Sequence, residues 1–108
     1  MFEVREQSYF ILVSLMAGRL HGYAIAKRAI ELSDGRLRLA AGTLYGALDR
    51  MLEEGLVIVD GEEEVRGKTR RYYRITDAGG HAVVAEVERM QAAVAAVERG
   101  RKWKAATA

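Results

Sequence analysis

The order of apolar and polar positions along this chain predicts three helices in its first half. Residues 7–16 are apolar on almost every face and are followed by Gly18. This pattern favours a helix buried on more than one side over a strand, whose polar residues would alternate. Residues 21–33 carry a helical apolar stripe opposite a charged face. Residues 41–54 predict a helix with one face in the core, formed by Leu44, Leu48, Met51 and Leu52.

Strand signals lie on both sides of the third predicted helix. Residues 36–39 alternate charged and apolar side chains, as a short edge strand would. Residues 56–59 and 70–75 are rich in β-branched and aromatic residues, and a polar loop over residues 60–69 separates them. The last two segments therefore predict a β-hairpin.

A long helix is predicted from Thr76, as its N-cap, to Arg99. Its apolar residues step by four, three, four and three positions, which is the a/d spacing of a coiled coil. They are Val83, Val87, Met90, Val94 and Val97. A helix with this stripe either lies across its own domain or pairs with a second copy of the chain. Residues 100–108, including Trp103, are predicted to form a frayed basic tail.

The resulting order of elements is helix, helix, short strand, helix, strand, loop, strand and helix. We predict a mainly α fold with a small β-hairpin. A winged helix-turn-helix would occupy residues 1–75, and a long C-terminal helix with its tail would occupy residues 76–108. In winged helix-turn-helix proteins the third helix enters the major groove of DNA, and the hairpin reaches an adjacent groove or the backbone.

The charge of the chain permits a nucleic-acid partner without requiring one. The formal net charge is +2 and the isoelectric point is about 9.1. Four of the 17 basic residues are lysines and the rest are arginines. Arginine is better suited to bidentate phosphate and guanine contacts. A GC-rich genome, whose codons favour arginine and alanine, explains the same bias equally well.

Several classes of protein receive no support from the sequence. The chain has no cysteine, which excludes disulfides and thiolate metal sites. His21 and His81 lie on different predicted elements, and we expect surface or capping roles for them and no bound metal. No nucleophile–base pair is visible, so we expect neither enzyme activity nor a cofactor. Without a long apolar run or a signal-peptide pattern, the protein is expected to be cytoplasmic and not to bind a membrane.

The first turns of the third predicted helix, residues 42–47, contain no charged residue. With two leucines turned inward, the exposed side is expected to hold Thr43, Tyr45, Gly46 and Ala47. Hydroxyl groups and small side chains at a helix N-terminus suit phosphate contact and close approach to a DNA groove. An ordinary amphipathic helix with surface threonine and tyrosine is the alternative. An exposed tyrosine near two glycines favours the DNA interface.

Residues 66–74 hold five basic residues and no acidic one, and they follow Glu62–Glu64 closely. On DNA this run would neutralise phosphates and make the affinity depend on salt. The alternative is a solvated basic strand that pairs with the three glutamates, since a charge run is usually a solvated face. The position of the run after a predicted recognition helix favours phosphate binding.

Four motifs follow one another along the chain. They are His-Gly-Tyr-Ala-Ile at 21–25, Gly-Thr-Leu-Tyr-Gly-Ala-Leu at 42–48, Leu-Glu-Glu-Gly-Leu at 52–56 and Arg-Arg-Tyr-Tyr-Arg-Ile-Thr-Asp-Ala-Gly at 70–79. In this order and spacing they resemble the PadR family of transcriptional regulators, and in particular the small subfamily with a single C-terminal dimerisation helix. The match spans roughly residues 7–99.

The resemblance implies a homodimeric, sequence-specific repressor that binds double-stranded DNA at an inverted-repeat operator. It also implies release by a small-molecule effector, which is aromatic or drug-like for some members. Residues 76–108 would then be the dimerisation helix and its tail. DNA contacts are expected from Tyr23, Lys27, Gly42, Thr43, Tyr45, Arg50, Lys68, Thr69, Arg70 and Arg71. The dimer interface and an effector cavity are expected from Phe10, Val13, Val83, Val87, Met90, Val94 and Val97.

Two other functions fit the same fold. One is a protein-binding winged helix whose basic wing docks an acidic partner. The other is a ligand-binding dimer that does not bind an operator. Only the DNA-binding function needs Thr43–Tyr45 and Arg70–Arg71 together.

Overall fold

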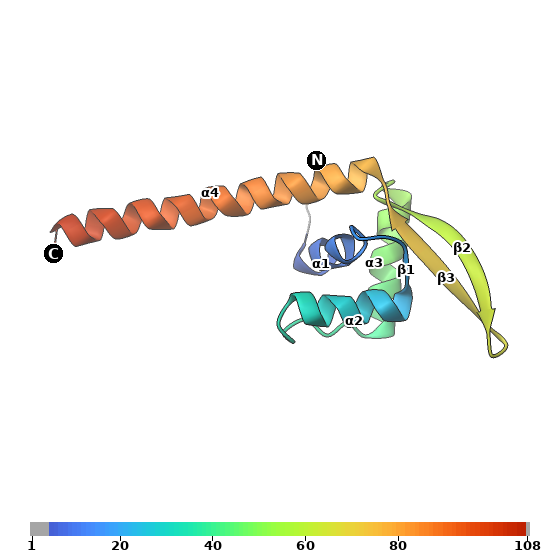
Figure 1. The fold of residues 1–108 in the computed structure, drawn as a ribbon. Coiled ribbons are helices and arrows are strands. Elements are labelled where there is room, and N and C mark those ends of the chain that lie inside the picture. Colours follow the sequence, from blue (N-terminus) through green and yellow to red (C-terminus); the bar gives the residue numbers. More distant parts are fainter. Residues whose placement is uncertain (1–4, 108) are drawn as a thin grey trace.

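The structure of the protein, a computed structural model, describes residues 5–107. Residues 1–4, where no signal-peptide pattern was found, and Ala108 lie outside the described residues. Three short helices form a cluster, a twisted hairpin flanks it on one side, and a long helix extends past it on the other (Figure 1). The elements are α1 (Glu6–Ser14), β1 (Leu20–His21), α2 (Gly22–Leu32), α3 (Ala41–Glu53), β2 (Val57–Val65), β3 (Lys68–Ile75) and α4 (Asp77–Thr107).

This arrangement is a winged helix-turn-helix followed by a long C-terminal helix, so the predicted fold class is confirmed. We refer to the β2–β3 hairpin, residues 57–75, as the wing and to residues 5–56 as the head. The core is formed by apolar side chains from all three head helices, from the wing and from Val83 of α4. Its largest fully buried side chains are Ile11, Leu12, Leu15, Ile25, Leu48, Met51, Val57 and Tyr73.

The surroundings of helix α1 account for its apolar sequence. It packs against α2 and also against the start of α4, so two of its sides are covered by the same chain. Ile11 and Leu12 are fully buried, while Phe10 and Val13 are half-buried. The prediction of a helix buried on more than one side is therefore confirmed, and α4 supplies the second covering surface.

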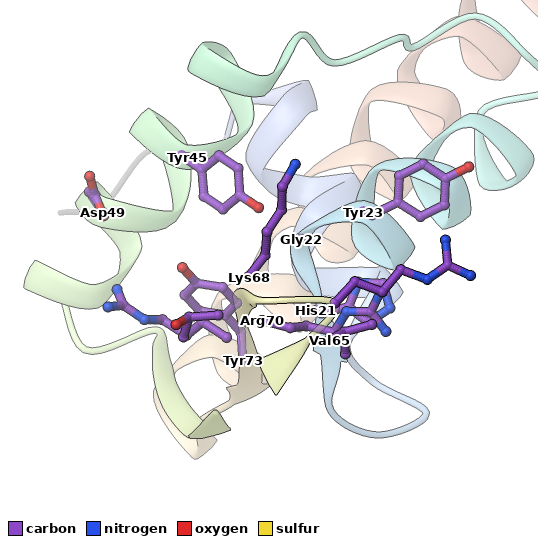
Figure 2. A pocket seen from close by; sticks show the side chains of 12 residues that line it. His21, Gly22, Tyr23, Tyr45, Asp49, Val65, Lys68, Arg70 and Tyr73 are labelled. Atoms are coloured by element: carbon purple, nitrogen blue, oxygen red, sulfur yellow. The ribbon is translucent and has the colours of Figure 1, made fainter. Parts of the chain in front are cut away.

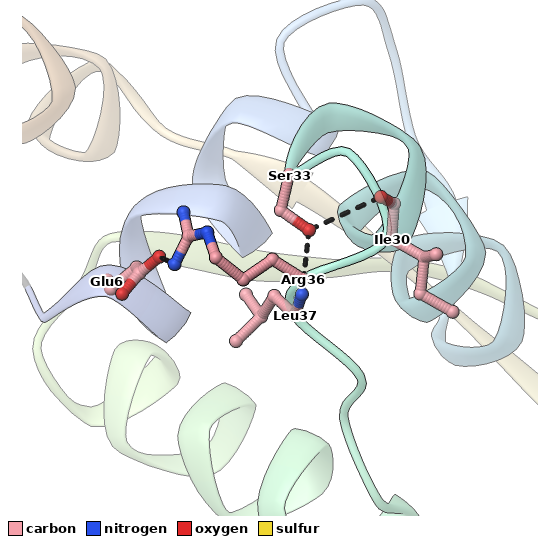
Figure 3. Close-up of polar contacts among 5 residues, drawn as sticks. All are labelled: Glu6, Ile30, Ser33, Arg36 and Leu37. Carbon is pink, nitrogen blue, oxygen red and sulfur yellow. Dashed lines mark hydrogen bonds and ion pairs between the residues drawn. The ribbon is translucent and has the colours of Figure 1, made fainter.

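The predicted edge strand over residues 36–39 is wrong, because this segment has no regular secondary structure. Figure 3 shows what holds it: the Ser33 hydroxyl donates to the carbonyl of Ile30 at 3.2 Å and accepts from the amide of Leu37 at 2.9 Å. Arg36 forms an ion pair with Glu6 of α1. The alternation arises because Leu37 and Leu39 are half-buried, with Leu39 packed against the core, and not because the backbone pairs with a strand.

The third strand of the sheet is β1. The antiparallel sheet has the order β1-β3-β2, with Leu20 opposite Tyr73 and His21 opposite Tyr72. A strand of two residues gives no periodic signal, which is why the sequence pattern did not indicate it. Its position is important because the chain passes directly from β1 into the first turn of α2.

The wing is longer than predicted, and the polar loop expected over residues 60–69 is wrong. The strands remain paired through Glu62–Glu64 and Val65, and only Arg66 and Gly67 form the turn. Both turn residues have positive φ angles, 53° and 78°, as two-residue hairpin turns of type I′ require. A register shift between Val59 and Glu62 marks a bulge. Both faces of the outer hairpin are polar, so no alternating pattern reveals it.

Helix α4 begins as predicted and ends later. The Thr76 hydroxyl accepts from the amide of Gly79 at 3.0 Å, which confirms the N-cap. The helix continues through Gly100 and Trp103 to Thr107, so the frayed tail over residues 100–107 is wrong. No helix within residues 5–107 has the length and apolar character needed to cross a membrane.

Candidate nucleic-acid interface

A groove of about 970 Å³ opens between the start of α2, helix α3 and the wing. Figure 2 shows tyrosine, histidine and basic side chains converging on it from these three elements. The groove is lined by His21, Gly22, Tyr23, Tyr45, Asp49, Val65, Arg66, Lys68, Thr69, Arg70, Arg71 and Tyr73.

The floor of the groove is the junction of α2 and α3. Gly22 is buried beneath the ring of Tyr45, and a Cβ at position 22 would come within 2.8 Å of the Tyr45 ring carbon that carries the hydroxyl. Glycine is therefore the residue that lets Tyr45 lie across the start of α2. Tyr45 remains 45% exposed in this position, and Tyr23 is 75% exposed. Both rings can contact a ligand in the groove without moving.

The start of α3 is open to solvent. Gly42 and Thr43 are exposed, and Ala40, the N-cap residue, has no side chain that can accept from the first amides of the helix. Ala47 was expected near the exposed side, but it is fully buried. It lies three positions after Leu44 and four before Met51, and therefore on the same core-facing stripe.

Positive charge dominates the groove. Its lining contains four basic side chains and one carboxylate, that of Asp49. Arg71 pairs with Glu62 across the wing at 3.6 Å, so the alternative of a basic strand neutralised by the glutamates is correct for this arginine. Among residues 5–107, Arg66, Lys68 and Arg70 form no ion pair. These three remain available for an anionic ligand.

The structure brings together six of the ten predicted DNA-contacting residues: Tyr23, Tyr45, Lys68, Thr69, Arg70 and Arg71. The other four, Lys27, Gly42, Thr43 and Arg50, are exposed on α2 and α3 but do not line the groove. Six other lining residues were not among the ten: His21, Gly22, Asp49, Val65, Arg66 and Tyr73. Arg66 could have been included because it begins the basic run, whereas no pattern distinguishes Asp49 from other surface acids.

Comparison with known proteins identifies the family of this chain. Residues 11–85 match the model of the transcriptional regulator PadR-like family. The chain belongs to this family.

Individual PadR-like and related proteins show the same fold at moderate identity. A transcriptional regulator from Clostridium thermocellum is 27% identical and superposes with a TM-score of 0.72, covering 84% of this chain and 88% of that one. Bacillus subtilis PadR, solved in complex with operator DNA, is 23% identical with a TM-score of 0.68, covering 77% of this chain and 48% of that one. At 23% identity, the similarity to Bacillus subtilis PadR shows a shared fold and nothing further.

A curated relative is the transcriptional regulator Rv3488 of Mycobacterium tuberculosis. It is 42% identical over 53 residues, which are 49% of this chain and 49% of Rv3488. The alignment thus spans about half the length of the relative.

The residues predicted for the dimer interface lie away from the groove of this PadR-like chain, since none of them lines it. Val83 is 4% exposed in the core, and Val87 packs against it. Farther along α4, Met90, Val94 and Val97 are 40%, 59% and 56% exposed. The predicted stripe is therefore divided: its first part covers the head, and its second part is open. Within residues 5–107, no group of three or more histidine and acidic side chains is arranged to hold a metal ion.

His21 lines the groove and also caps the N-terminus of α2. Its Nδ1 accepts from the amide of Ala24 at 3.2 Å, so the predicted capping role is confirmed. Burial lowers the pKa of His21, and the positive charge of Arg70 lowers it further, while Glu63 opposes them. A protonated Nδ1 could not accept the capping bond. The neutral ring is therefore the form that the folded state favours.

We expect the stability of the protein to fall in mild acid because of His21. Its folded-state pKa is lowered, so its contribution is complete above the ordinary pKa of about 6.5 and is lost as the pH falls through the lowered value. His21→Asn keeps a capping acceptor that does not titrate in this range. Urea denaturation between pH 8 and pH 5 should show the wild type losing stability relative to this variant. A constant difference between the two proteins would contradict the assignment.

Proposed function

We propose that this PadR-like protein is a homodimeric repressor that binds double-stranded DNA sequence-specifically at an inverted-repeat operator. The groove of Figure 2 carries the proposal, because it joins the basic side chains of the wing to the starts of α2 and α3. A related fold, that of Bacillus subtilis PadR, has been solved with operator DNA, which supports a DNA-binding role. The proposed role is regulatory and cytoplasmic, with no catalytic step; the description of the family, that of transcriptional regulators, supports the regulatory part.

Phosphate contacts are assigned to the wing and to the start of α3. Among residues 5–107, Arg66, Lys68 and Arg70 form no ion pair that DNA binding would have to break. The amides in the first turn of α3 lack a side-chain cap, and a phosphate can accept from them. These contacts would position the protein on any sequence.

Base contacts are assigned to α3 and to the tyrosine beside it. Thr43 and Tyr45 are exposed near the start of the helix, where recognition helices contact base edges. Tyr45 lies against Gly22 and keeps 45% of its surface exposed, so its ring is placed where a DNA base could contact it. Packing on one side of the ring lowers the entropy cost of ordering it on binding.

The dimer is assigned to α4. Its distal half presents Met90, Val94 and Val97 in line with the buried Val83, so the same stripe continues beyond the head. A second copy of α4 offers a matching stripe for this surface. We propose that residues 76–108 serve assembly and residues 1–75 serve DNA binding, with two heads in successive major grooves roughly 34–36 Å apart.

We also propose that a small hydrophobic or aromatic effector relieves repression. Helix α1 lies between α2 and α4, and its half-buried Phe10 and Val13 are candidates to contact such a ligand. Binding there would shift the population of dimers toward a different angle between the two DNA-binding heads. A ligand that binds tightly but changes neither the separation of the heads nor the DNA affinity would contradict this mechanism.

The function is tested by fluorescence anisotropy with the duplex upstream of the protein's own coding region, at several salt concentrations and with random duplex as competitor. We expect saturable binding that survives the competitor and weakens steeply with salt. Binding equal to that of random duplex would contradict recognition of this sequence. No binding to either duplex at low salt would overturn the proposed function.

A single substitution in the wing separates phosphate contacts from general charge. Lys68→Ala should weaken binding to all duplexes by a similar factor, about 5- to 10-fold, and reduce the slope of log affinity against log salt by about one. Arg99→Ala is the matched control, because Arg99 is exposed on the distal half of α4. Equal effects of the two substitutions would show that only net charge matters and would remove the wing from the interface.

A further inference from the structure

We propose that Arg19 is a positioning residue that holds the wing at its DNA-binding angle; this inference rests on the proposed DNA-binding function. Arg19 lies in the connection just before β1 and does not line the groove. Its Nη1 donates to the backbone carbonyl of Asp60 at 2.8 Å, across 41 positions of sequence. Its guanidinium carbon lies 4.6 Å from the centroid of the Tyr72 ring. One side chain of the head therefore contacts both strands of the wing.

The contact falls at the bend of the wing. Asp60 and Gly61 lie in the register shift between Val59 and Glu62, where β2 has no backbone register partner on β3. The Asp60 side chain pairs with Arg74 of β3 at 3.4 Å, so the Asp60 carbonyl is the group left for Arg19. A bulge of this kind bends and twists a strand and interrupts the ladder that would stiffen it. Gly61 has a φ of 106°, and a Cβ there would come within 2.8 Å of the Arg19 Nη1. The backbone at the bulge is shaped to receive the guanidinium.

The second contact connects the same point to the start of α2. The ring of Tyr72 meets that of His21 edge to face, with centroids 5.6 Å apart. The Tyr72 hydroxyl also donates to Glu63 at 3.1 Å, on the outer side of the bulge. Arg19 and Tyr72 thus connect His21, the capping residue of α2, to the wing on both sides of the bulge. Arg66 and Lys68 lie farther out, at the tip of the wing.

A guanidinium group suits both contacts at once. Its plane stacks on an aromatic face while an edge N–H donates to a carbonyl, and an ammonium group cannot match this geometry. The substitution Arg19→Lys keeps the charge, so it leaves the long-range attraction to DNA in place and removes only the geometry. A direct phosphate contact by residue 19 would largely survive this substitution, whereas the positioning role would not.

The test is a double-mutant cycle on duplex affinity. We expect Arg19→Lys to weaken binding about 5-fold or more and to change the melting temperature little. In the Arg19→Lys background, Lys68→Ala should lower duplex affinity less than about 2-fold, against about 5- to 10-fold in the wild type. The reason is that a displaced wing no longer places Lys68 against the DNA. Lys27→Ala, on α2, is the control and should cost the same in both backgrounds. Additive losses for Arg19 and Lys68, or unchanged binding by Arg19→Lys, would overturn the proposal.

A measurement without DNA separates failure of this inference from failure of the proposed function. The chain has no cysteine, so spin labels can be placed at Arg28→Cys on α2 and Glu64→Cys on the wing, with labelled chains diluted into unlabelled ones. Both positions are exposed. We expect a narrow distance distribution in the otherwise unchanged protein and a broader or shifted one with Arg19→Lys. Identical distributions would refute the bracing role of Arg19, even if the protein binds operator DNA.

Discussion

Substituting glutamate for Val94 and Val97 is expected to convert the proposed homodimer into a monomer and to weaken the proposed operator binding by roughly 100-fold or more. The two valines are 59% and 56% exposed on the distal half of α4. In the proposed dimer they are buried against the second copy, where unpaired carboxylates would strongly oppose association. A monomer retains a single head and loses the gain from engaging two half-sites at once.

The surroundings of the stripe explain why a second α4 is its expected partner. The proximal part of the stripe, formed by Val83 and Val87, packs on the head. The exposed distal part is therefore continuous with a packed surface. Small side chains flank the exposed part and permit close approach of another helix; they are Ala92, Ala93, Ala95 and Ala96. The molecule is 66 Å long but only 28 × 22 Å across, which leaves this part of α4 beyond the head.

Val84→Glu is the matched control for this experiment. Val84 is on the same helix and is 52% exposed, but it lies outside the stripe. Sedimentation velocity should give a dimer for the wild type and for Val84→Glu, and a monomer for the double substitution. If the double variant remains a dimer, the interface lies elsewhere. If it is a monomer with undiminished operator affinity, each head binds alone and the inverted-repeat assignment fails.

The parts of the fold that could be read from the sequence are those in which burial imposes a period. Leu44, Leu48 and Met51 repeat along one face because α3 has one covered side, and they predicted that helix correctly. The N-cap at Thr76 was equally readable, because a hydroxyl before a helix serves a local hydrogen bond. The alternation at Leu37 and Leu39 misled, because partial burial of a loop gives the same pattern as a strand.

The candidate site was only partly readable. A basic run after the predicted recognition helix indicated Lys68 and Arg70, which line the groove, without any knowledge of the tertiary structure. The role of Arg19 depends on a bulge and on a contact across 41 positions, and neither leaves a local pattern. Arg71 has the same residue type as Arg70, but only the strand register reveals that Glu62 is its partner. The position of the turn sets which residues face each other across the two strands. The sequence predicted a loop over residues 60–69, so the two-residue turn and the pairing that follows from it were not predicted.

Gly79→Ala is expected to destabilise the protein by about 3 kcal/mol, the upper part of the usual range for overpacking. Gly79 is buried at the third position of α4, where the helix passes over the end of the head. A Cβ at this position would overlap the backbone carbonyl oxygen of Leu56 and approach Cγ1 of Ile75 to 2.7 Å. The carbonyl oxygen cannot move aside easily, because it accepts from the amide of Thr76 at 3.0 Å. Relief would require α4 to shift away from the core.

Gly80→Ala provides the control at the next position. Nothing lies within 4 Å of a Cβ there, so alanine should stabilise the helix by about 0.5 to 1 kcal/mol. Thermal denaturation followed by circular dichroism should lower the melting temperature of Gly79→Ala by roughly 12–24 °C and raise that of Gly80→Ala by a few degrees. Protein concentration must be the same throughout, since dimer stability depends on it. Similar melting temperatures for the two variants would mean that α4 can shift away from the Leu56 carbonyl at little cost in stability. The packing of α4 on the head would then not be rigid.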